Sequence, residues 1–291
     1  SRLHSGSNRR GIEKITLFSA PDLEADVELA DTQNVVLAAG GMGNAQILLA
    51  SDDGTGAEVG NERDQVGRYL MEHPHLPNCA TFVLRSDFSL GNPPAEFGGS
   101  FPVLVPNDEL FFDTEEIDAS FEIIEAQLDV DDAIQQFVIE RLGGDAKAFS
   151  LFGRSEMMAD PENRVRRIAA TDPAGLPRLK ATCVVDSSSI RSMLTYLERL
   201  GVSLSEQGVG RLRINDLDLM ASLSGGGHTM GTTRMGTDPA TSVTDPNCRV
   251  HGYRNLFVAG SSLFPTGGYA NPTLTIIALA ARLGDFLGKA A

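Results

Sequence analysis

Two glycine-rich bends near the C-terminus carry the residues best suited to chemistry. His228 follows the three glycines 225–227, and Asn271 stands directly before Pro272. A histidine can take the proton of a hydroxyl group, because its ordinary pKa of about 6.5 lies close to neutral pH. An asparagine amide can hold the substrate oxygen beside such a base. Together the two residues predict a site for a small polar substrate such as an alcohol.

Oxidation of an alcohol also needs an acceptor for the hydride that leaves its carbon. No side chain accepts a hydride, so this chemistry requires a cofactor such as a flavin. Each of the two residues also has a simpler interpretation. His228 could be a loop residue that bonds backbone groups, and Asn271 could be the N-cap of the helix that follows. Asn271 can fill both roles, because a capping side chain can also face a site.

Four segments are expected to position these bends. Residues 34–41 are mostly apolar and end in glycines, as a buried parallel strand does where it meets a ligand-facing turn. A helix is expected over 44–51, with its first residue, Asn44, as N-cap. Residues 255–261 predict a strand that runs into a Gly-Ser turn, and 272–288 predict a long helix with proline at its first position.

The middle of the chain has a different character. Runs of β-like sequence at 78–84 and 147–152 alternate with charged loops. Residues 186–200 predict a helix with one apolar face, because Ile190, Met193 and Leu197 recur at helical spacing, and Asp186 or Ser187 is expected to cap it. Mixed strands and helices of this kind are typical of an α+β domain.

These patterns predict an α/β protein with one domain inserted into another. Residues 1–71 and 221–291 are expected to form part of a nucleotide-binding, Rossmann-like domain. Residues 72–220 are expected to form an inserted α+β domain that binds the substrate. The chain has 291 residues, which allows one or two domains.

Composition excludes several classes of function. A hydrophobic content of 42% predicts a globular core, and a net charge of −15 disfavours binding to the phosphates of nucleic acids. No apolar run reaches the ~20 residues that span a bilayer. The cellular location is left open, with the cytoplasm slightly favoured.

Neither the cysteines nor the histidines predict a metal site. The three cysteines, Cys79, Cys183 and Cys248, are too far apart for a CxxC motif, and their odd number argues against a disulfide framework. His73 and His75 flank Pro74 and could bind a metal as a pair, but no third ligand is apparent. His73 is instead a weak candidate for a residue that lines the site.

Several blocks of the sequence resemble the signature of the glucose–methanol–choline (GMC) family of FAD-dependent oxidoreductases. They occur in the family's order and cover both ends of the chain well and the middle loosely. The blocks are Val-Val-Leu-Ala-Ala-Gly-Gly-Met-Gly-Asn-Ala-Gln-Ile-Leu-Leu (35–49), Val-Gly-Arg-Tyr-Leu-Met-Glu-His-Pro (66–74), His-Thr-Met-Gly-Thr-Thr-Arg-Met-Gly (228–236), Asp-Pro-Asn-Cys-Arg-Val-His-Gly (245–252), Asn-Leu-Phe-Val-Ala-Gly-Ser-Ser (255–262) and Tyr-Ala-Asn-Pro-Thr-Leu-Thr (269–275).

The resemblance implies an enzyme that oxidises an alcohol, with FAD as the hydride acceptor. His228 and Asn271 match the family's catalytic pair, in a variant similar to pyranose oxidase-like and bacterial sugar-oxidising members. A sugar or glycoside is therefore the expected substrate, whereas the exact substrate and the electron acceptor stay open. The alternative is a non-catalytic subunit that keeps the fold. The residues that the resemblance places beside FAD are Ala39, Gly40, Gly260, Ser261, Asn271, Pro272 and Thr273.

One departure from the family concerns the loop that holds the pyrophosphate of FAD. The G-x-G-x-x-G sequence of that loop is absent from these residues, and the Gly-Gly-Met-Gly run at 40–43 follows a later strand of the sheet. The chain is therefore expected to be a C-terminal portion, completed by an N-terminal FAD-binding part that is missing, cleaved or present as a separate chain.

Overall fold

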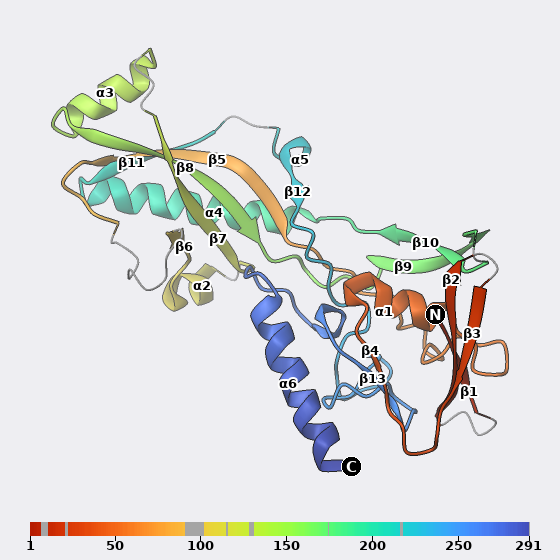
Figure 1. Cartoon of the computed structure of the whole chain (residues 1–291). Coiled ribbons are helices and arrows are strands. Elements are labelled where there is room, and N and C mark those ends of the chain that lie inside the picture. The colour runs from red at the N-terminus through yellow and green to blue at the C-terminus, as the bar shows by residue number, and fades with distance from the viewer. Residues whose placement is uncertain are drawn as a thin grey trace.

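The computed structural model describes residues 1–6, 11–20, 23–90, 102–114, 116–127, 131–173, 175–215 and 218–290. The molecule has two lobes, joined where β5, β12 and the long segment after β12 meet (Figure 1). We call them the terminal lobe, which contains both termini, and the sheet lobe, which contains the largest sheet. The mixture of strands and helices confirms the predicted α/β class.

The terminal lobe is organised around two parallel strands. β4 (Val35–Leu37) pairs in parallel with β13 (Leu256–Val258), and α1 (Gly40–Leu49) and the 3-10 helix η2 (Ser261–Leu263) follow their carboxyl ends. Because the strands are parallel, both turns lie at the same edge. The long C-terminal helix α6 (Thr273–Ala290) lies beside them (Figure 1).

Two further antiparallel elements complete the terminal lobe. β1 (Arg2–Ser5), β2 (Ile12–Ala20) and β3 (Leu23–Glu28) form one sheet, and β9 (Arg164–Thr171) and β10 (Pro177–Thr182) form a hairpin. The hairpin comes from the middle of the chain, which the sequence assigned to the inserted domain. Its residues Val165 and Leu179 nevertheless pack into the core of the terminal lobe, with Leu48, Val258 and Leu283.

The sheet lobe is an antiparallel sheet covered by a helix. The strand order is β11-β5-β8-β7-β6, with β12 also paired to β5. Their bounds are β5 (Pro74–Arg85), β6 (Val103–Leu104), β7 (Ala119–Ala126), β8 (Ala146–Ser155), β11 (Gly210–Ile214) and β12 (Ser224–Gly225), and the helices are α2 (Asp108–Thr114), α3 (Ala133–Arg141), α4 (Ser187–Glu206) and α5 (Leu219–Ser222).

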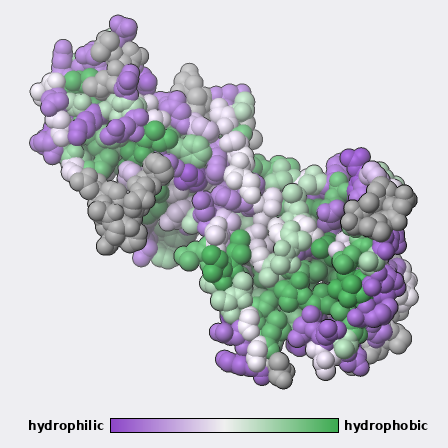
Figure 2. Space-filling view, viewed as in Figure 1, coloured by the Kyte–Doolittle hydropathy of each residue, from purple (hydrophilic) through white to green (hydrophobic). Residues whose placement is uncertain are grey.

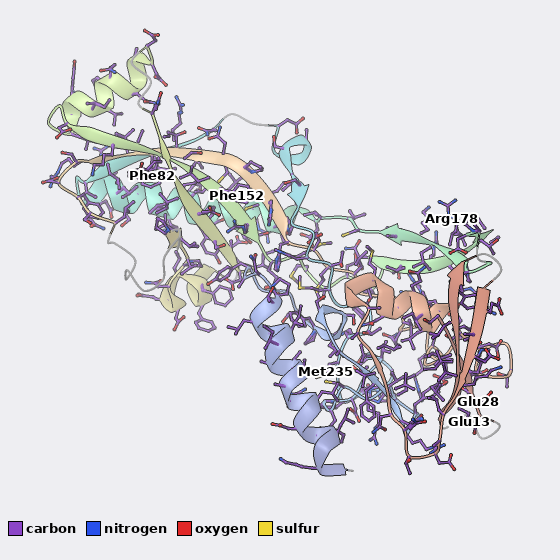
Figure 3. The ribbon with its side chains drawn as sticks, in the orientation of Figure 1. Glu13, Glu28, Phe82, Phe152, Arg178 and Met235 are labelled. Carbon is purple, nitrogen blue, oxygen red and sulfur yellow. The ribbon has the colours of Figure 1, made fainter. Side chains whose placement is uncertain are left out.

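Helix α4 covers the sheet with the apolar face that the sequence predicted. Met193 and Leu197 are fully buried in a core that includes Phe82 of β5 and Leu151 of β8. Figure 3 shows Phe82 within this lobe. The predicted cap is also present, since the Asp186 carboxylate accepts a hydrogen bond of 2.6 Å from the backbone N–H of Ser188.

The predicted start of the first helix was wrong by four residues. The helix α1 begins at Gly40, directly after the strand, and Asn44 lies inside it with no solvent exposure. Gly40 has a φ of +83°, a conformation open to glycine that lets the chain turn into the helix at once. Asn44 is therefore a buried cross-link rather than an N-cap.

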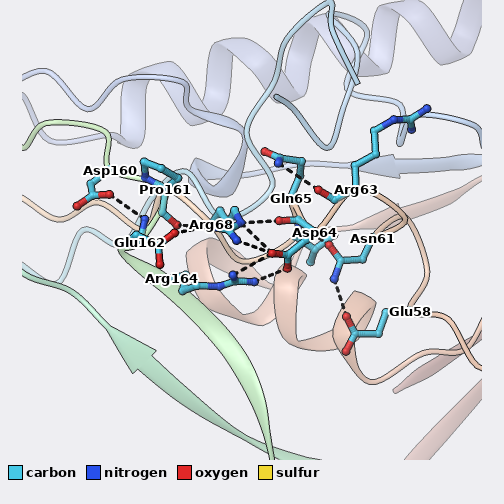
Figure 4. A network of polar contacts seen from close by, with 11 residues as sticks. Glu58, Asn61, Arg63, Asp64, Gln65, Arg68, Asp160, Pro161, Glu162 and Arg164 are labelled. Atoms are coloured by element: carbon cyan, nitrogen blue, oxygen red, sulfur yellow. Dashed lines mark hydrogen bonds and ion pairs between the residues drawn. The ribbon is translucent and has the colours of Figure 1, made fainter. Parts of the chain in front are cut away.

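An ion-pair network joins the segment before β5 to the hairpin (Figure 4). Arg164 Nη2 lies 2.6 Å from one carboxylate oxygen of Asp64, and Arg68 binds the other. Arg68 Nη1 also lies 2.7 Å from Glu162 Oε1. The hydrogen bond from Arg164, supported by Arg68, lowers the pKa of Asp64 from 3.8 to about 2.

This network predicts an acid-dependent contribution to stability. A carboxylate whose pKa is lowered on folding stabilises the fold above its unfolded pKa and loses that effect as the pH falls through the folded value. The Asp64→Asn variant should therefore melt below wild type at pH 7, and the gap should narrow between about pH 4 and pH 2. Melting scans across this range check the prediction. A difference in melting temperature that stays the same at every pH would contradict it. Because the Asp64 side chain is 56% exposed, the effect should be small.

The surface of the terminal lobe carries several exposed apolar side chains. Figure 2 shows hydrophobic residues gathered on the face of this lobe that carries α6, β4 and β13. Leu274 and Ile277 of α6 are 79% and 60% exposed, and Val36 of β4 is 42% exposed.

Within the described residues, every helix is too short or too polar to cross a bilayer. The three cysteines are all free.

Candidate active site

Strand pairing of β12 with β5 brings the segments that carry His228 and His73 together. Ser224 of β12 lies opposite His75 of β5, and Gly226 N–H donates to the carbonyl of His73 at 3.2 Å. A short bridge between Met71 and Met230 continues the pairing on the other side of the bend. The bend that carries His228 is thus held against residues 71–75, which come from a block far away in the sequence.

His228 contacts a buried histidine that the sequence ranked as a weak candidate. The Nδ1 atoms of His73 and His228 lie 3.0 Å apart, and the two rings meet edge to face with their centroids 5.1 Å apart. The other ring nitrogen of His73 lies 3.4 Å from the carbonyl oxygen of Gly267. His73 is fully buried, whereas His228 is partly exposed. Only one ring nitrogen of His228 is therefore engaged by this contact.

Burial lowers the pKa of both neighbouring histidines. For His73 this desolvation outweighs the hydrogen bond to Gly267, which acts in the opposite direction. For His75 burial is again the largest cause, followed by the positive charge of Arg154. His75 also packs against Phe152, with ring centroids 5.1 Å apart, and Figure 3 shows Phe152 in the sheet lobe. Both His73 and His75 are thus favoured in their neutral forms at neutral pH.

Two glutamates that the sequence analysis did not select hold this arrangement. One Glu72 oxygen accepts hydrogen bonds from the backbone N–H groups of both His73 and His228. Glu156 Oε1 accepts from the N–H groups of Gly267 and Gly268, at 3.2 and 3.0 Å. Glu72 stands in the Glu-His-Pro-His run, so its position beside two histidines was the available signal. Glu156 has no comparable signal, because it acts on backbone that is remote in sequence.

The glycines predicted to bind the cofactor form an open cradle at the ends of the two parallel strands. A side chain at Gly40 would meet no atom within 4 Å, and at Gly260 it would come no nearer than 3.9 Å to any atom. The atoms nearest to that Gly260 position are Asn44 Nδ2 and the Cα of Gly40. The cradle is therefore a space left between bare backbone segments, which suits the close approach of an extended cofactor.

Buried hydrogen bonds fix the two sides of the cradle. Asn44 accepts from the N–H of Ala39 at 2.7 Å, and its amide donates to the carbonyl of Ala259 at 2.9 Å and to Ser262 Oγ at 2.8 Å. The end of β4 is thus tied to the end of β13. Since Asn44 is fully buried, each of its polar atoms needs such a partner.

The His228 bend also touches the cradle. The carbonyl oxygen of Thr229 accepts a hydrogen bond of 2.8 Å from Ser261 Oγ. A Cβ atom at Gly41 would lie 2.0 Å from the same oxygen, so only glycine permits this approach. The predicted base and the predicted cofactor residues Ala39, Gly40, Gly260 and Ser261 therefore belong to one continuous structure.

The loop that leads to Asn271 lies close to His73. The loop is held by Glu156 and by the approach of Gly267 to His73. Asn271 itself is exposed, and among the described residues no hydrogen bond or ring contact joins it to His228.

The predicted helix start at Pro272 differs from the structure by one residue. The helix α6 begins at Thr273, and the carbonyl of Pro272 accepts the first bond, of 2.9 Å, from Ile276 N–H. Pro272 therefore stands in the capping position. Among the described residues, no hydrogen bond links the Asn271 side chain to the first turn. The cap interpretation of Asn271 was therefore wrong, because the helix begins one residue later than expected.

Among the described residues, no set of three or more histidine, cysteine, aspartate or glutamate side chains is arranged to hold a metal ion. His73 and His75 instead take part in the ring contacts around His228.

Comparison with known families finds a match in the C-terminal half of the chain. A family model described as GMC oxidoreductase matches residues 159–280. The fructose dehydrogenase large subunit of Gluconobacter japonicus is 26% identical over 94% of this chain and 50% of its own length. The pyranose 2-oxidase of Tricholoma matsutake is 47% identical over 19% of this chain and 10% of its own length.

The fold also matches a solved structure over nearly the whole chain. A formate oxidase from Aspergillus oryzae RIB40 superposes with a TM-score of 0.59 and 17% sequence identity, covering 98% of this chain and 59% of that one. The chain spans about half the length of the fructose dehydrogenase subunit.

Proposed function

Since residues 159–280 match the GMC oxidoreductase family model, we propose that this chain is the C-terminal portion of an FAD-dependent enzyme of that family. The enzyme oxidises an alcohol group of a sugar or glycoside. This substrate class is supported by the relatives, which include a fructose dehydrogenase subunit and a pyranose 2-oxidase. The formate oxidase of the same fold carries an FAD, which supports the choice of cofactor.

One observation carries the proposal: the bend that holds His228 is continuous with the glycine cradle. Thr229, the next residue, is bound by Ser261 and approached closely by Gly41. A base on this bend sits at the border of the space where a cofactor would lie. His228 takes the hydroxyl proton of the substrate, and Asn271 donates a hydrogen bond to the substrate oxygen.

The cradle residues fit the cofactor that the family implies. Gly40 and Gly260 leave room beside bare backbone, and Ala39 and Ser261 flank them. Pro272 stands directly before α6 and Thr273 begins it, and the positive end of that helix favours negative charge nearby. A flavin bound here would supply the acceptor for the hydride. The protein's own part is to hold the cofactor, orient the substrate and move the proton.

A complete flavin site requires a pyrophosphate-binding loop, which these residues do not supply. We place that loop in a further N-terminal FAD-binding part of the same protein or of a partner chain. We likewise retain the predicted division of the chain, with residues 72–220 as the substrate-binding part, except that the β9–β10 hairpin packs with the terminal lobe.

The cradle can be tested by filling it. Gly40→Val places a side chain in the space assigned to the cofactor, so the complete protein should purify with little or no flavin, measured by its visible absorbance. Gly54→Val is the matched control, because Gly54 has a similar φ of +87° and also has no neighbour within 4 Å. Both variants carry similar backbone strain. Equal flavin content in the two variants would contradict the assignment of the cradle.

The same measurement separates the enzyme from the alternative of a non-catalytic subunit. If the chain is a subunit that keeps the fold without binding flavin, the complete wild-type protein should itself show no flavin absorbance.

A further inference from the structure

The hydrogen-bond partners of His73 determine which of its two ring nitrogens carries a proton. The chain runs from the Gly267 carbonyl to His73 Nε2, and from His73 Nδ1 to His228 Nδ1, with separations of 3.4 and 3.0 Å. A neutral imidazole has one nitrogen that donates and one that accepts. A carbonyl oxygen only accepts, so the proton of His73 must lie on Nε2.

The other ring nitrogen of His73, Nδ1, then carries no hydrogen and can only accept a hydrogen bond. The 3.0 Å contact between the two Nδ1 atoms needs one proton, and this proton must belong to His228. Because His73 is fully buried, no solvent water can offer its Nδ1 an alternative donor. Burial also lowers the pKa of His73, which keeps its ring in the neutral form that this pattern requires. The neutral ring of His228 therefore carries its hydrogen on Nδ1, and its Nε2 is an unprotonated acceptor.

We infer that His73 is a positioning residue, which holds His228 in the tautomer whose Nε2 can take a proton from the substrate. This role rests on the proposed function of His228 as the base. When Nε2 takes the hydroxyl proton, His228 becomes an imidazolium, and its Nδ1–H donates a charge-assisted hydrogen bond to His73. The proton stays on Nε2, and the hydrogen on Nδ1 does not move.

Glu72 and the β12 pairing make this arrangement rigid. The Glu72 carboxylate binds the backbone N–H groups of both histidines, so the backbones that carry the two rings are held together. Gly226 closes the bend against His73, and a Cβ atom there would come within 3.1 Å of His228 Nδ1. The backbone thus brings the two residues together, and the Gly267 carbonyl sets which nitrogens carry the protons.

Two variants of His73 in the flavin-containing complete protein test the inference by activity. His73→Leu removes the acceptor but keeps an apolar side chain in the buried space, and should slow flavin reduction by substrate about 10- to 100-fold. His73→Asn places an amide oxygen where the imidazole Nδ1 lies, so it should recover most of the lost rate. An unchanged rate in His73→Leu would overturn the inference. So would His73→Asn being as slow as His73→Leu, because a packing role alone would then explain both.

A spectroscopic test does not depend on catalysis. In protein labelled with ¹⁵N-histidine, two-bond ¹H–¹⁵N correlation spectra distinguish the two neutral tautomers, and the five histidines can be assigned by single substitutions. The His228 signals should show the Nδ1–H form in the wild type and in His73→Asn, and a shift toward the Nε2–H form in His73→Leu. An Nε2–H tautomer in the wild type would overturn the inference. Failure of the proposed function is seen separately, as fast flavin reduction in a protein that lacks His228.

Discussion

Replacing His228 with alanine should slow flavin reduction by substrate by roughly two to four orders of magnitude. The proposed base is lost, and no neighbouring group can replace it readily. His73 is fully buried, and its pKa is lowered by that burial. His75 Nε2 is buried without a hydrogen-bond partner. Flavin should stay bound, because the cradle is built from backbone at the ends of β4 and β13 rather than from the imidazole ring.

The measurement is anaerobic stopped-flow reduction of the bound flavin, with flavin content determined on the same sample. His251→Ala is the control, since His251 bonds Ser242 at 2.9 Å within the terminal lobe and lies outside the proposed site. It should reduce its flavin at the wild-type rate. A near-normal rate in His228→Ala, with flavin intact, would remove His228 from the mechanism.

The second large effect is expected for Asn271→Asp. As a substrate ligand, Asn271 must donate a hydrogen bond, which an ionised carboxylate cannot do. Its negative charge would also oppose the transfer of a hydride to the flavin. Reduction should therefore be severely slowed. The melting temperature should barely change, because Asn271 is exposed and, in the part of the chain that the structure describes, no bond from it caps α6.

A matched variant isolates the effect of position from that of charge. Asn34→Asp makes the same substitution at another exposed asparagine, in the loop before β4, and should leave the reduction rate unchanged. If Asn271→Asp reduces its flavin quickly and only its melting temperature moves, Asn271 has a structural role alone, and the proposed pairing with His228 fails.

Local features of the sequence were sufficient for several elements and for the family. Asp186 and the spaced apolar residues that follow it specified the start and the buried face of α4, since a cap and a helical period act within a few residues. The apolar run before Gly40 specified a strand at a glycine turn, and the structure pairs it in parallel with β13. The motif blocks likewise indicated the family whose model matches residues 159–280.

Local signals misled where a side chain bonds distant partners. Asn44 has the residue type of an N-cap, but its amide bonds Ala259 and Ser262 across the lobe, and the positive φ of Gly40 lets the helix start earlier. The β9–β10 hairpin likewise joins the terminal core through Val165 and Leu179, because burial is decided by which surfaces meet and not by sequence order.

The sequence by itself determined which residue types were available for chemistry: a histidine and an asparagine on glycine-rich bends, and glycines at the ends of strands. Only the tertiary structure decided which residues hold His228, the proposed base. His73 and His228 are 155 residues apart, and they meet because β12 pairs with β5. The proposed direction, in which His73 donates to Gly267 and accepts from His228, depends on both partners lying within hydrogen-bond distance once the chain has folded. Hydrogen bonds act over about 3 Å, so no sequence pattern could reveal this contact before the lobes were in place.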